Sequence, residues 1–107
     1  MLLEVVTYQV KEGVSEEELI KLSNNFEMIL KRDIAGFVRR ELTKCIDSNR
    51  WIELLWWDSE SSVKEALVKV TTTEEFAQYC EILVDNGGED IKYFSEVSIS
   101  HESVKMD

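Results

Sequence analysis

Hydrophobic and polar positions alternate with period two at the start of the chain and then change to helical spacing. Residues 2–10 alternate and are rich in Val, Thr and Tyr, which predicts a first strand. Ser15 stands three residues before Glu18, the spacing of a capping box that opens a helix. Apolar residues then recur every three or four positions. The pattern predicts a first helix that ends at about Arg32.

A hairpin follows this helix. Gly36-Phe37 opens a second alternating strand, and Asp47-Ser48-Asn49 suits a tight turn, because Asp and Asn bond their own backbone. The third strand, Trp51 to Trp57, reads Trp-Ile-Glu-Leu-Leu-Trp-Trp. Glu53 is its one charged residue, so both faces of the strand are apolar, with Trp56 opposite Trp51 and Trp57.

Two shorter helices are predicted next. Asp58 and Ser59 can cap the first of them, and Thr72 with Glu75 forms another capping box that opens the second. Both segments carry apolar residues at helical spacing.

A turn at residues 86–88 precedes a fourth strand over residues 91–100. The order is β-α-β-β-α-(α)-β, which predicts an α+β fold of ferredoxin-like βαββαβ type, with a four-stranded antiparallel sheet and helices on one face. We expect residues 1–100 to form this single domain and residues 101–107 to form a polar C-terminal tail.

The third strand predicts a partner for the sheet. Helices cover one face, yet the strand presents Trp and Leu to both, and an uncovered apolar face usually marks an interface. We expect a homodimer that forms through the sheet face. The alternative is that the tail, His101 to Asp107, folds back as a cover.

Charge and cysteine content exclude several classes of function. The chain of 107 residues has 22 acidic and 12 basic residues, and a net charge of −10 disfavours nucleic acid and membrane surfaces as partners. It opens without a signal-peptide pattern, and no segment is apolar enough to span a bilayer, so we expect a cytoplasmic protein. Cys45 and Cys80 are far apart and His101 is the one histidine, so we expect free thiols and neither a metal site nor a cofactor.

The run Leu54-Leu55-Trp56-Trp57-Asp58-Ser59-Glu60, together with Gly36-Phe37, resembles the dimeric α+β barrel superfamily, and within it the antibiotic biosynthesis monooxygenase group. The resemblance covers nearly the whole chain. It implies two ferredoxin-like units whose sheets pack into a barrel, and an apolar cleft between the sheet and the helices of each subunit. The superfamily's enzymes include cofactor-independent monooxygenases of quinol-like aromatics and haem-degrading monooxygenases.

The haem-degrading pattern does not transfer to this sequence. It requires an Asn in the first strand and a His after the second helix, where this chain has Val6 and Thr7, then Tyr79 and Cys80. We therefore expect no haem degradation by that arrangement.

The remaining candidate site is aromatic. Trp57, Phe76 and Tyr79 are expected to line an apolar pocket, with Arg39 or Arg40 at its mouth to orient an anionic or phenolic ligand. The leading hypothesis is a monooxygenase-like barrel protein that oxidises or binds a small aromatic molecule. The alternatives are a non-catalytic ligand-binding or stress-related barrel protein, and aromatic residues that pack only as core.

Overall fold

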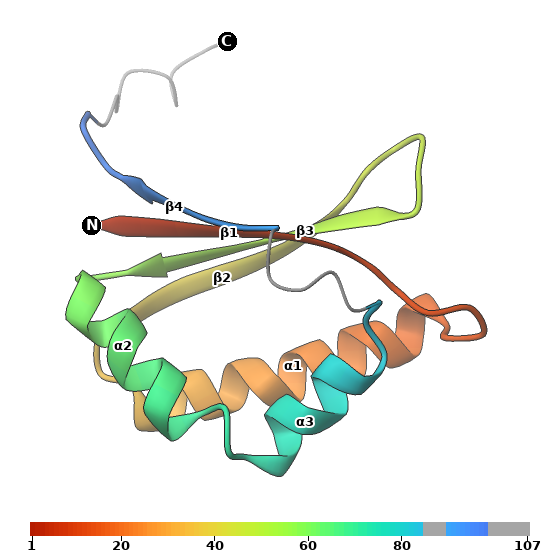
Figure 1. Ribbon diagram of the computed structural model, residues 1–107, viewed down its shortest axis with the longest axis horizontal. Helices are drawn as coiled ribbons and strands as arrows, with labels where there is room; N and C mark the ends of the chain where they lie inside the picture. The colour runs from red at the N-terminus through yellow and green to blue at the C-terminus, as the bar shows by residue number, and fades with distance from the viewer. Residues whose placement is uncertain (85–89, 99–107) are drawn as a thin grey trace, which may run out of the picture.

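The structure is a computed structural model that describes residues 1–84 and 90–98. Four strands form one antiparallel sheet in the order β2-β3-β1-β4, and three helices lie against one of its faces (Figure 1). This arrangement confirms the predicted ferredoxin-like fold. The elements are β1 (Leu2–Gln9), α1 (Glu16–Asp33), β2 (Phe37–Lys44), β3 (Arg50–Trp57), α2 (Glu60–Lys69), α3 (Glu74–Glu81) and β4 (Ile91–Ser95).

Helix starts follow from capping side chains. Ser15 caps α1 by accepting a hydrogen bond from the backbone N–H of Glu18 (3.1 Å), and Ser59 caps α2 in the same way. The predicted capping box at Thr72 is wrong by one residue, because Thr73 caps α3. The Thr73 backbone N–H bonds back to Val70 at 3.0 Å, so the first extended residue after this turn is Thr73.

A bulge in β2 changes which side chains face the helices. Phe37 pairs with Trp57 and Arg39 pairs with Trp56, so two residues advance on β2 for one on β3. Strict alternation along this strand would place Phe37 and Arg39 on one face. The inserted residue instead places Phe37 and Arg40 on the helical face and Arg39 on the opposite one.

The two faces of β3 have different burial. Trp51 and Trp57 are buried against the helices, whereas Trp56 points to the other face and is partly exposed, as predicted. The sheet face that no helix covers is visible in Figure 1. By strand register, this face carries apolar residues from three neighbouring strands. We call it the open face; its apolar members are Leu3, Val5, Ile52, Leu54, Trp56 and Phe94.

Gly36 brings the start of β2 against the start of α2. A Cβ at this position would overlap the side chains of Ser62 and Asp58, so glycine is required by close approach. The Asp58 backbone N–H donates to the Gly36 carbonyl at 2.8 Å and fixes the junction. This contact holds the end of β3, with Trp57, under the first turn of α2.

The C-terminal part of the chain is shorter in regular structure than predicted. The fourth strand ends at Ser95, not at residue 100. The predicted turn at 86–88 and the tail 101–107, with His101, lie outside the described residues. In residues 1–84 and 90–98, no helix combines the length and apolar character needed to cross a bilayer.

Candidate functional site

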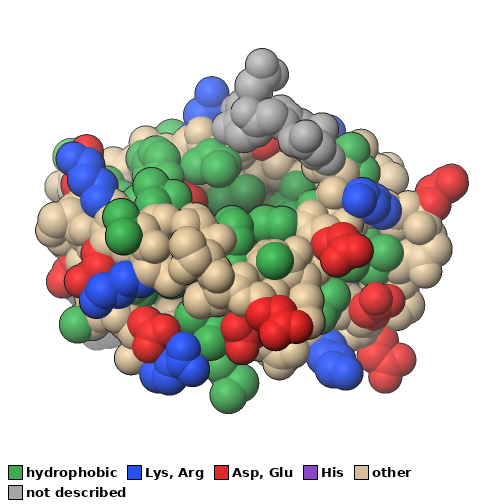
Figure 2. All heavy atoms as spheres, turned by 60° about the horizontal axis from the view of Figure 1, so that its bottom comes forward, with side chains coloured by type: hydrophobic (Ala, Val, Ile, Leu, Met, Phe, Trp, Pro, Cys, Tyr) green, Lys and Arg blue, Asp and Glu red, His purple; other side chains and the backbone are tan. Residues whose placement is uncertain are grey.

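A cavity of about 430 Å³ lies between the sheet and the helices. Figure 2 shows hydrophobic side chains in and around a hollow on the helical side of the molecule. Most of the wall is apolar and comes from every helix and from three of the strands. The lining residues are Glu4, Val6, Phe26, Leu30, Glu53, Leu55, Trp57, Val63, Ala66, Leu67, Val70, Thr71, Phe76, Tyr79, Cys80, Leu83, Val84, Ile91 and Tyr93.

The carboxyl of Glu4 is the polar group on the β1 side of the cavity. The indole Nε1–H of Trp57 donates a hydrogen bond to Glu4 Oε1 at 3.0 Å. Tyr93 pairs with Glu4 across β1 and β4, and it also lines the cavity. Glu4 therefore lies between two aromatic side chains on the wall formed by the sheet.

The environment of Glu4 raises the pKa of its carboxyl, so the neutral form persists to higher pH than usual. Burial raises the pKa of Glu4 from 4.5 to about 7, the Trp57 hydrogen bond lowers it, and the negative charge of Glu53 raises it further. The carboxyl thus changes its charge near neutral pH. A carboxyl with this property in a cavity is a candidate acid–base group.

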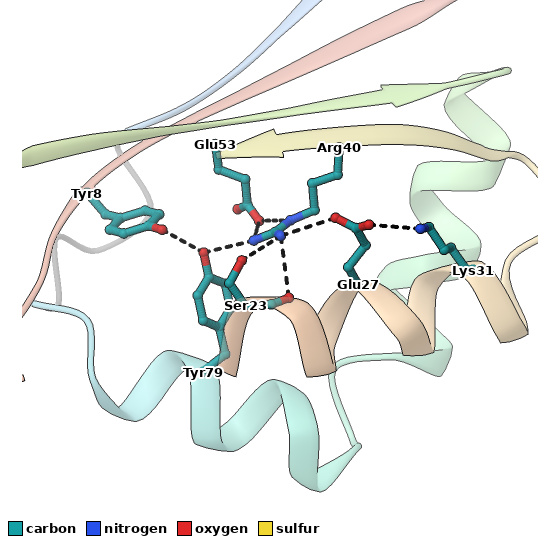
Figure 3. A network of polar contacts seen from close by, with 7 residues as sticks. All are labelled: Tyr8, Ser23, Glu27, Lys31, Arg40, Glu53 and Tyr79. Carbon is teal, nitrogen blue, oxygen red and sulfur yellow. Dashed lines mark hydrogen bonds and ion pairs between the residues drawn. The ribbon is translucent and has the colours of Figure 1, made fainter. Parts of the chain in front are cut away.

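A second buried carboxyl, that of Glu53 on β3, has a full counter-charge. Arg40 of β2 forms an ion pair and a hydrogen bond with Glu53 (Figure 3). The two side chains are 2% and 6% exposed, respectively. Burial raises the pKa of Glu53, and the Arg40 guanidinium opposes this rise. For Arg40, burial lowers the pKa, but the charge and hydrogen bond of Glu53 together with the two neighbouring tyrosines raise it, and the pKa is raised overall.

The guanidinium of Arg40 joins several elements of the fold. It donates to Ser23 Oγ on α1 (2.6 Å) and to the hydroxyl of Tyr79 on α3 (3.1 Å), and Tyr79 in turn bonds the Tyr8 hydroxyl of β1 (2.7 Å) (Figure 3). Glu27 lies 3.6 Å from Arg40 at the outer end of this network.

The two tyrosines of this network stay neutral. Burial raises the pKa of Tyr8 to about 12 and raises that of Tyr79 as well. The hydrogen bonds of these groups lie within the protein, so the network fixes α1 and α3 against the sheet.

The structure brings together three of the five residues expected at the site. Trp57, Phe76 and Tyr79 line the cavity. Arg40 is held behind the wall by Glu53 and is not among the lining residues. Arg39 lies on the open face, where its guanidinium stacks over Trp56 at 4.1 Å, because the β2 bulge turns it away from the helices.

Two carboxyls, those of Glu4 and Glu53, were not among the expected site residues. Each is a charged residue in a strand that is otherwise almost entirely apolar on the helical side. In β1 the alternation already places Glu4 with Val6 and Tyr8 on one face. A charge within an apolar set is the signal that could have indicated a buried site.

The chemistry open to this cavity is that of a carboxyl in apolar surroundings. Cys80 also lines the cavity, and burial raises the pKa of its thiol, which disfavours a reactive thiolate. Within the described part of the chain, no three His, Cys, Asp or Glu residues are grouped to hold a metal ion. The Glu4 carboxylate can accept a hydrogen bond or a proton from a bound molecule.

Comparison with known proteins finds similarity to solved structures. No family model and no curated protein sequence matches this chain. Among solved structures, it is similar to SnoaB, a cofactor-independent oxygenase from Streptomyces nogalater, with 16% identity, coverage of 94% of this chain and 97% of that one, and a TM-score of 0.76. A further similar structure is At3g17210 from Arabidopsis thaliana (16% identity, 94% and 99% coverage, TM-score 0.71).

A third similar structure comes from Caulobacter crescentus and is proposed to be an antibiotic biosynthesis monooxygenase (19% identity, 91% and 90% coverage, TM-score 0.68). At these identities the likeness concerns the fold. The chain therefore has the fold of the antibiotic biosynthesis monooxygenase-like proteins, as the resemblance of its Trp57-bearing segment indicated.

Proposed function

We propose that this chain is a monooxygenase-like dimeric α+β barrel protein that oxidises a small quinol-like aromatic without a cofactor. The observation that carries the proposal is the apolar cavity beside Trp57, with the Glu4 carboxyl in its wall. A volume of about 430 Å³ lies within the range of small-molecule sites and suits a molecule of two or three fused rings. The fold likeness to a cofactor-independent oxygenase supports the same reading.

The reaction needs an electron-rich substrate more than a reactive protein group. For an anthrone, the balanced change converts one ring methylene and one molecule of dioxygen into one ring carbonyl and one molecule of water. The two C–H bonds of the methylene break, one oxygen atom forms the carbonyl, and the other leaves as water. The methylene supplies all four electrons that dioxygen accepts.

The protein has two tasks in such a reaction. It excludes water from the ring system through the apolar walls, and it accepts a proton so that negative charge enters the ring. Glu4 is the lining carboxyl without a cationic partner among the described residues, so it is our candidate acceptor. Trp57 orients this carboxyl by its indole hydrogen bond.

The open face supports the homodimer. It carries six apolar side chains, and Phe94 among them is half exposed in the single chain. A second copy packed face to face would remove this surface from water and would close the sheets into a barrel. Light scattering at micromolar concentration should give twice the chain mass, and a stable monomer would overturn the dimer.

The activity is tested by oxygen uptake. Purified protein is mixed with a panel of hydroquinones and anthrones in an oxygen electrode, and products are analysed after reaction under isotopically labelled dioxygen. We expect catalysed uptake with at least one compound, and one labelled oxygen atom in the product. A variant that fills the cavity, Ala66→Phe, should lose this activity, whereas Glu12→Gln at an exposed site should keep it.

The second candidate is a non-catalytic ligand-binding protein. This function is favoured because Glu53 is paired with Arg40, and Tyr79 is hydrogen-bonded to Arg40 and Tyr8. Few polar groups on that side of the cavity are therefore available for chemistry. Saturable binding of aromatics with no oxygen uptake from any of them would select this second function.

A further inference from the structure

The cavity contains negative charge but no described cation. Glu4 and Glu53 are its lining carboxyls, and no Lys, Arg or His occurs among its described lining residues. The Arg40 guanidinium, which pairs with the lining residue Glu53, also donates to Ser23 and Tyr79. An anionic ligand would thus meet Glu4 in apolar surroundings without a counter-ion, which is unfavourable.

The position of Glu4 suits a hydrogen-bond donor on the ligand. The described residues give Glu4 a single hydrogen bond, from Trp57 to Oε1. An ionised carboxylate can accept several, so Oε2 retains acceptor capacity toward a ligand. A hydroxyl on an aromatic ring would supply that donor while the ring packs against Trp57 and Tyr93.

We infer that Glu4 makes the cavity specific for uncharged aromatics that carry a ring hydroxyl, whose hydrogen it accepts, and that Glu4 excludes carboxylated aromatics. The inference deepens the proposed function and rests on it, since it names the ligand class of the same cavity. The sequence predicted Arg39 or Arg40 at the mouth of the pocket, to orient an anionic or phenolic ligand. In this inference the ligand is instead oriented by a carboxylate, that of Glu4.

The charge of Glu4 sets a pH dependence for this binding. The titratable groups that face it are Glu53 from β3, Tyr93 from β4, and Tyr79 and Cys80 from α3, while α1 and α2 contribute apolar lining residues. Burial raises the pKa of Glu4 to about 7, so the carboxylate accepts the hydroxyl hydrogen above this pH. Below it, Glu4 is neutral and its repulsion of anions weakens.

Three naphthalene ligands that match in shape test the inference by calorimetry. 2-Naphthol offers a hydroxyl, 2-methoxynaphthalene lacks the donor, and 2-naphthoate carries a negative charge. At pH 8 we expect 2-naphthol to bind about tenfold more tightly than the methyl ether, the usual scale for a hydrogen bond to a charged group, and 2-naphthoate to bind most weakly. 2-Naphthol should bind more weakly at pH 6 than at pH 8. Both pH values lie below the range in which 2-naphthol itself ionises, so the change reports the protein.

The variant Glu4→Gln tests whether Glu4 is the residue that sets the ligand preference. Glutamine keeps an oxygen that accepts the Trp57 hydrogen bond but has no charge, so binding of 2-naphthoate should improve at least tenfold and the pH dependence of 2-naphthol binding should disappear. Glu12→Gln, at an exposed position, should bind like the parent protein. Circular dichroism and melting curves show whether each variant is folded.

The outcomes separate this inference from the proposed function. Naphthoate binding as tight as naphthol binding, or an order of affinities unchanged in Glu4→Gln, would overturn the inference. No binding of any of the three ligands would overturn both proposals. Glu4-dependent preference for 2-naphthol, with no oxygen uptake from any quinol or anthrone, would support this inference and remove the oxygenase activity.

Discussion

Glu4 and Glu53 lie on the same face of the sheet, on neighbouring strands, and both line the cavity. Glu53 has a buried guanidinium as its partner, whereas Glu4 has the indole N–H of Trp57. The first carboxyl belongs to the framework that fixes α1 and α3, and the second keeps acceptor capacity at the cavity wall. The difference shows that a buried acid becomes a candidate for function when its counter-charge is missing.

Removing Arg40 should have the largest effect, because it leaves Glu53 buried without a counter-charge. We expect Arg40→Met to lower the free energy of unfolding by about 3–5 kcal/mol, measured by urea denaturation at pH 7. Arg32→Met, at an exposed pair with Asp33, should leave the unfolding midpoint unchanged.

The double variant Arg40→Met/Glu53→Met tests whether the loss of stability comes from the unpaired charge of Glu53. It removes both charges and should recover most of the lost stability, because an apolar pair of similar volume needs no counter-ion. If Arg40→Met alone left the unfolding midpoint unchanged, the ion pair would not be the framework described above.

Glu4→Gln should increase stability at high pH, in contrast to Arg40→Met. The folded pKa of Glu4, about 7, lies above its unfolded value of 4.5, so the folded protein binds the proton more tightly. This contribution to stability is full below pH 4.5 and is lost as the pH rises through 7.

The parent protein should therefore lose about 3 kcal/mol relative to Glu4→Gln between pH 4.5 and pH 8. Urea denaturation of both proteins at pH 5 and pH 8 measures this difference. Parallel stability curves across this range would show that Glu4 titrates normally.

Trp57→Phe removes the hydrogen bond that Glu4 receives from the described residues, a bond that lowers the pKa of Glu4. The ionised carboxyl then loses its donor, so the pKa of Glu4 should rise further, and the variant should be destabilised by about 1–2 kcal/mol more at pH 8 than at pH 5. Trp51→Phe, a buried tryptophan outside the cavity lining, is the matched control and should show no such pH-dependent difference.

The smallest expected effect is a change in the rate at which the Cys80 thiol is alkylated. This thiol lines the cavity, so saturating 2-naphthol should slow alkylation of Cys80 severalfold. Cys45 lies just after β2, away from the cavity lining, and should react at the same rate with and without the ligand. Mass spectrometry of the two peptides measures both rates in one sample, and equal protection at the two cysteines would exclude binding beside Cys80.

Much of the fold could be predicted from the sequence, because the spacing at which apolar residues recur indicates which face of a helix or strand is buried. The division of β3, with Trp56 opposite Trp51 and Trp57, follows from alternation alone. The positions of Arg39 and Arg40 could not be predicted, because one inserted residue in β2 reverses the faces and leaves no mark in composition.

The candidate site was only partly visible in the sequence for a related reason. Aromatic residues on apolar faces could be assigned to a pocket, but whether a charge among them is paired depends on contacts between distant strands. Glu53 meets Arg40 across β2 and β3, and Glu4 does not have such a neighbour among the described residues. That contrast arises from three-dimensional register, which no local pattern contains.

The role of Glu4 as the carboxyl that binds a ligand's hydroxyl can be measured by NMR titration of its carboxyl carbon, in the free protein and with saturating 2-naphthol. We predict a midpoint near pH 7 in the free protein. The midpoint should fall when the ligand's hydroxyl stabilises the carboxylate, since hydrogen bonds to the charged form lower the pKa of an acid. A midpoint near 4.5 that does not respond to the ligand would show that Glu4 is an ordinary carboxyl that takes no part in ligand binding.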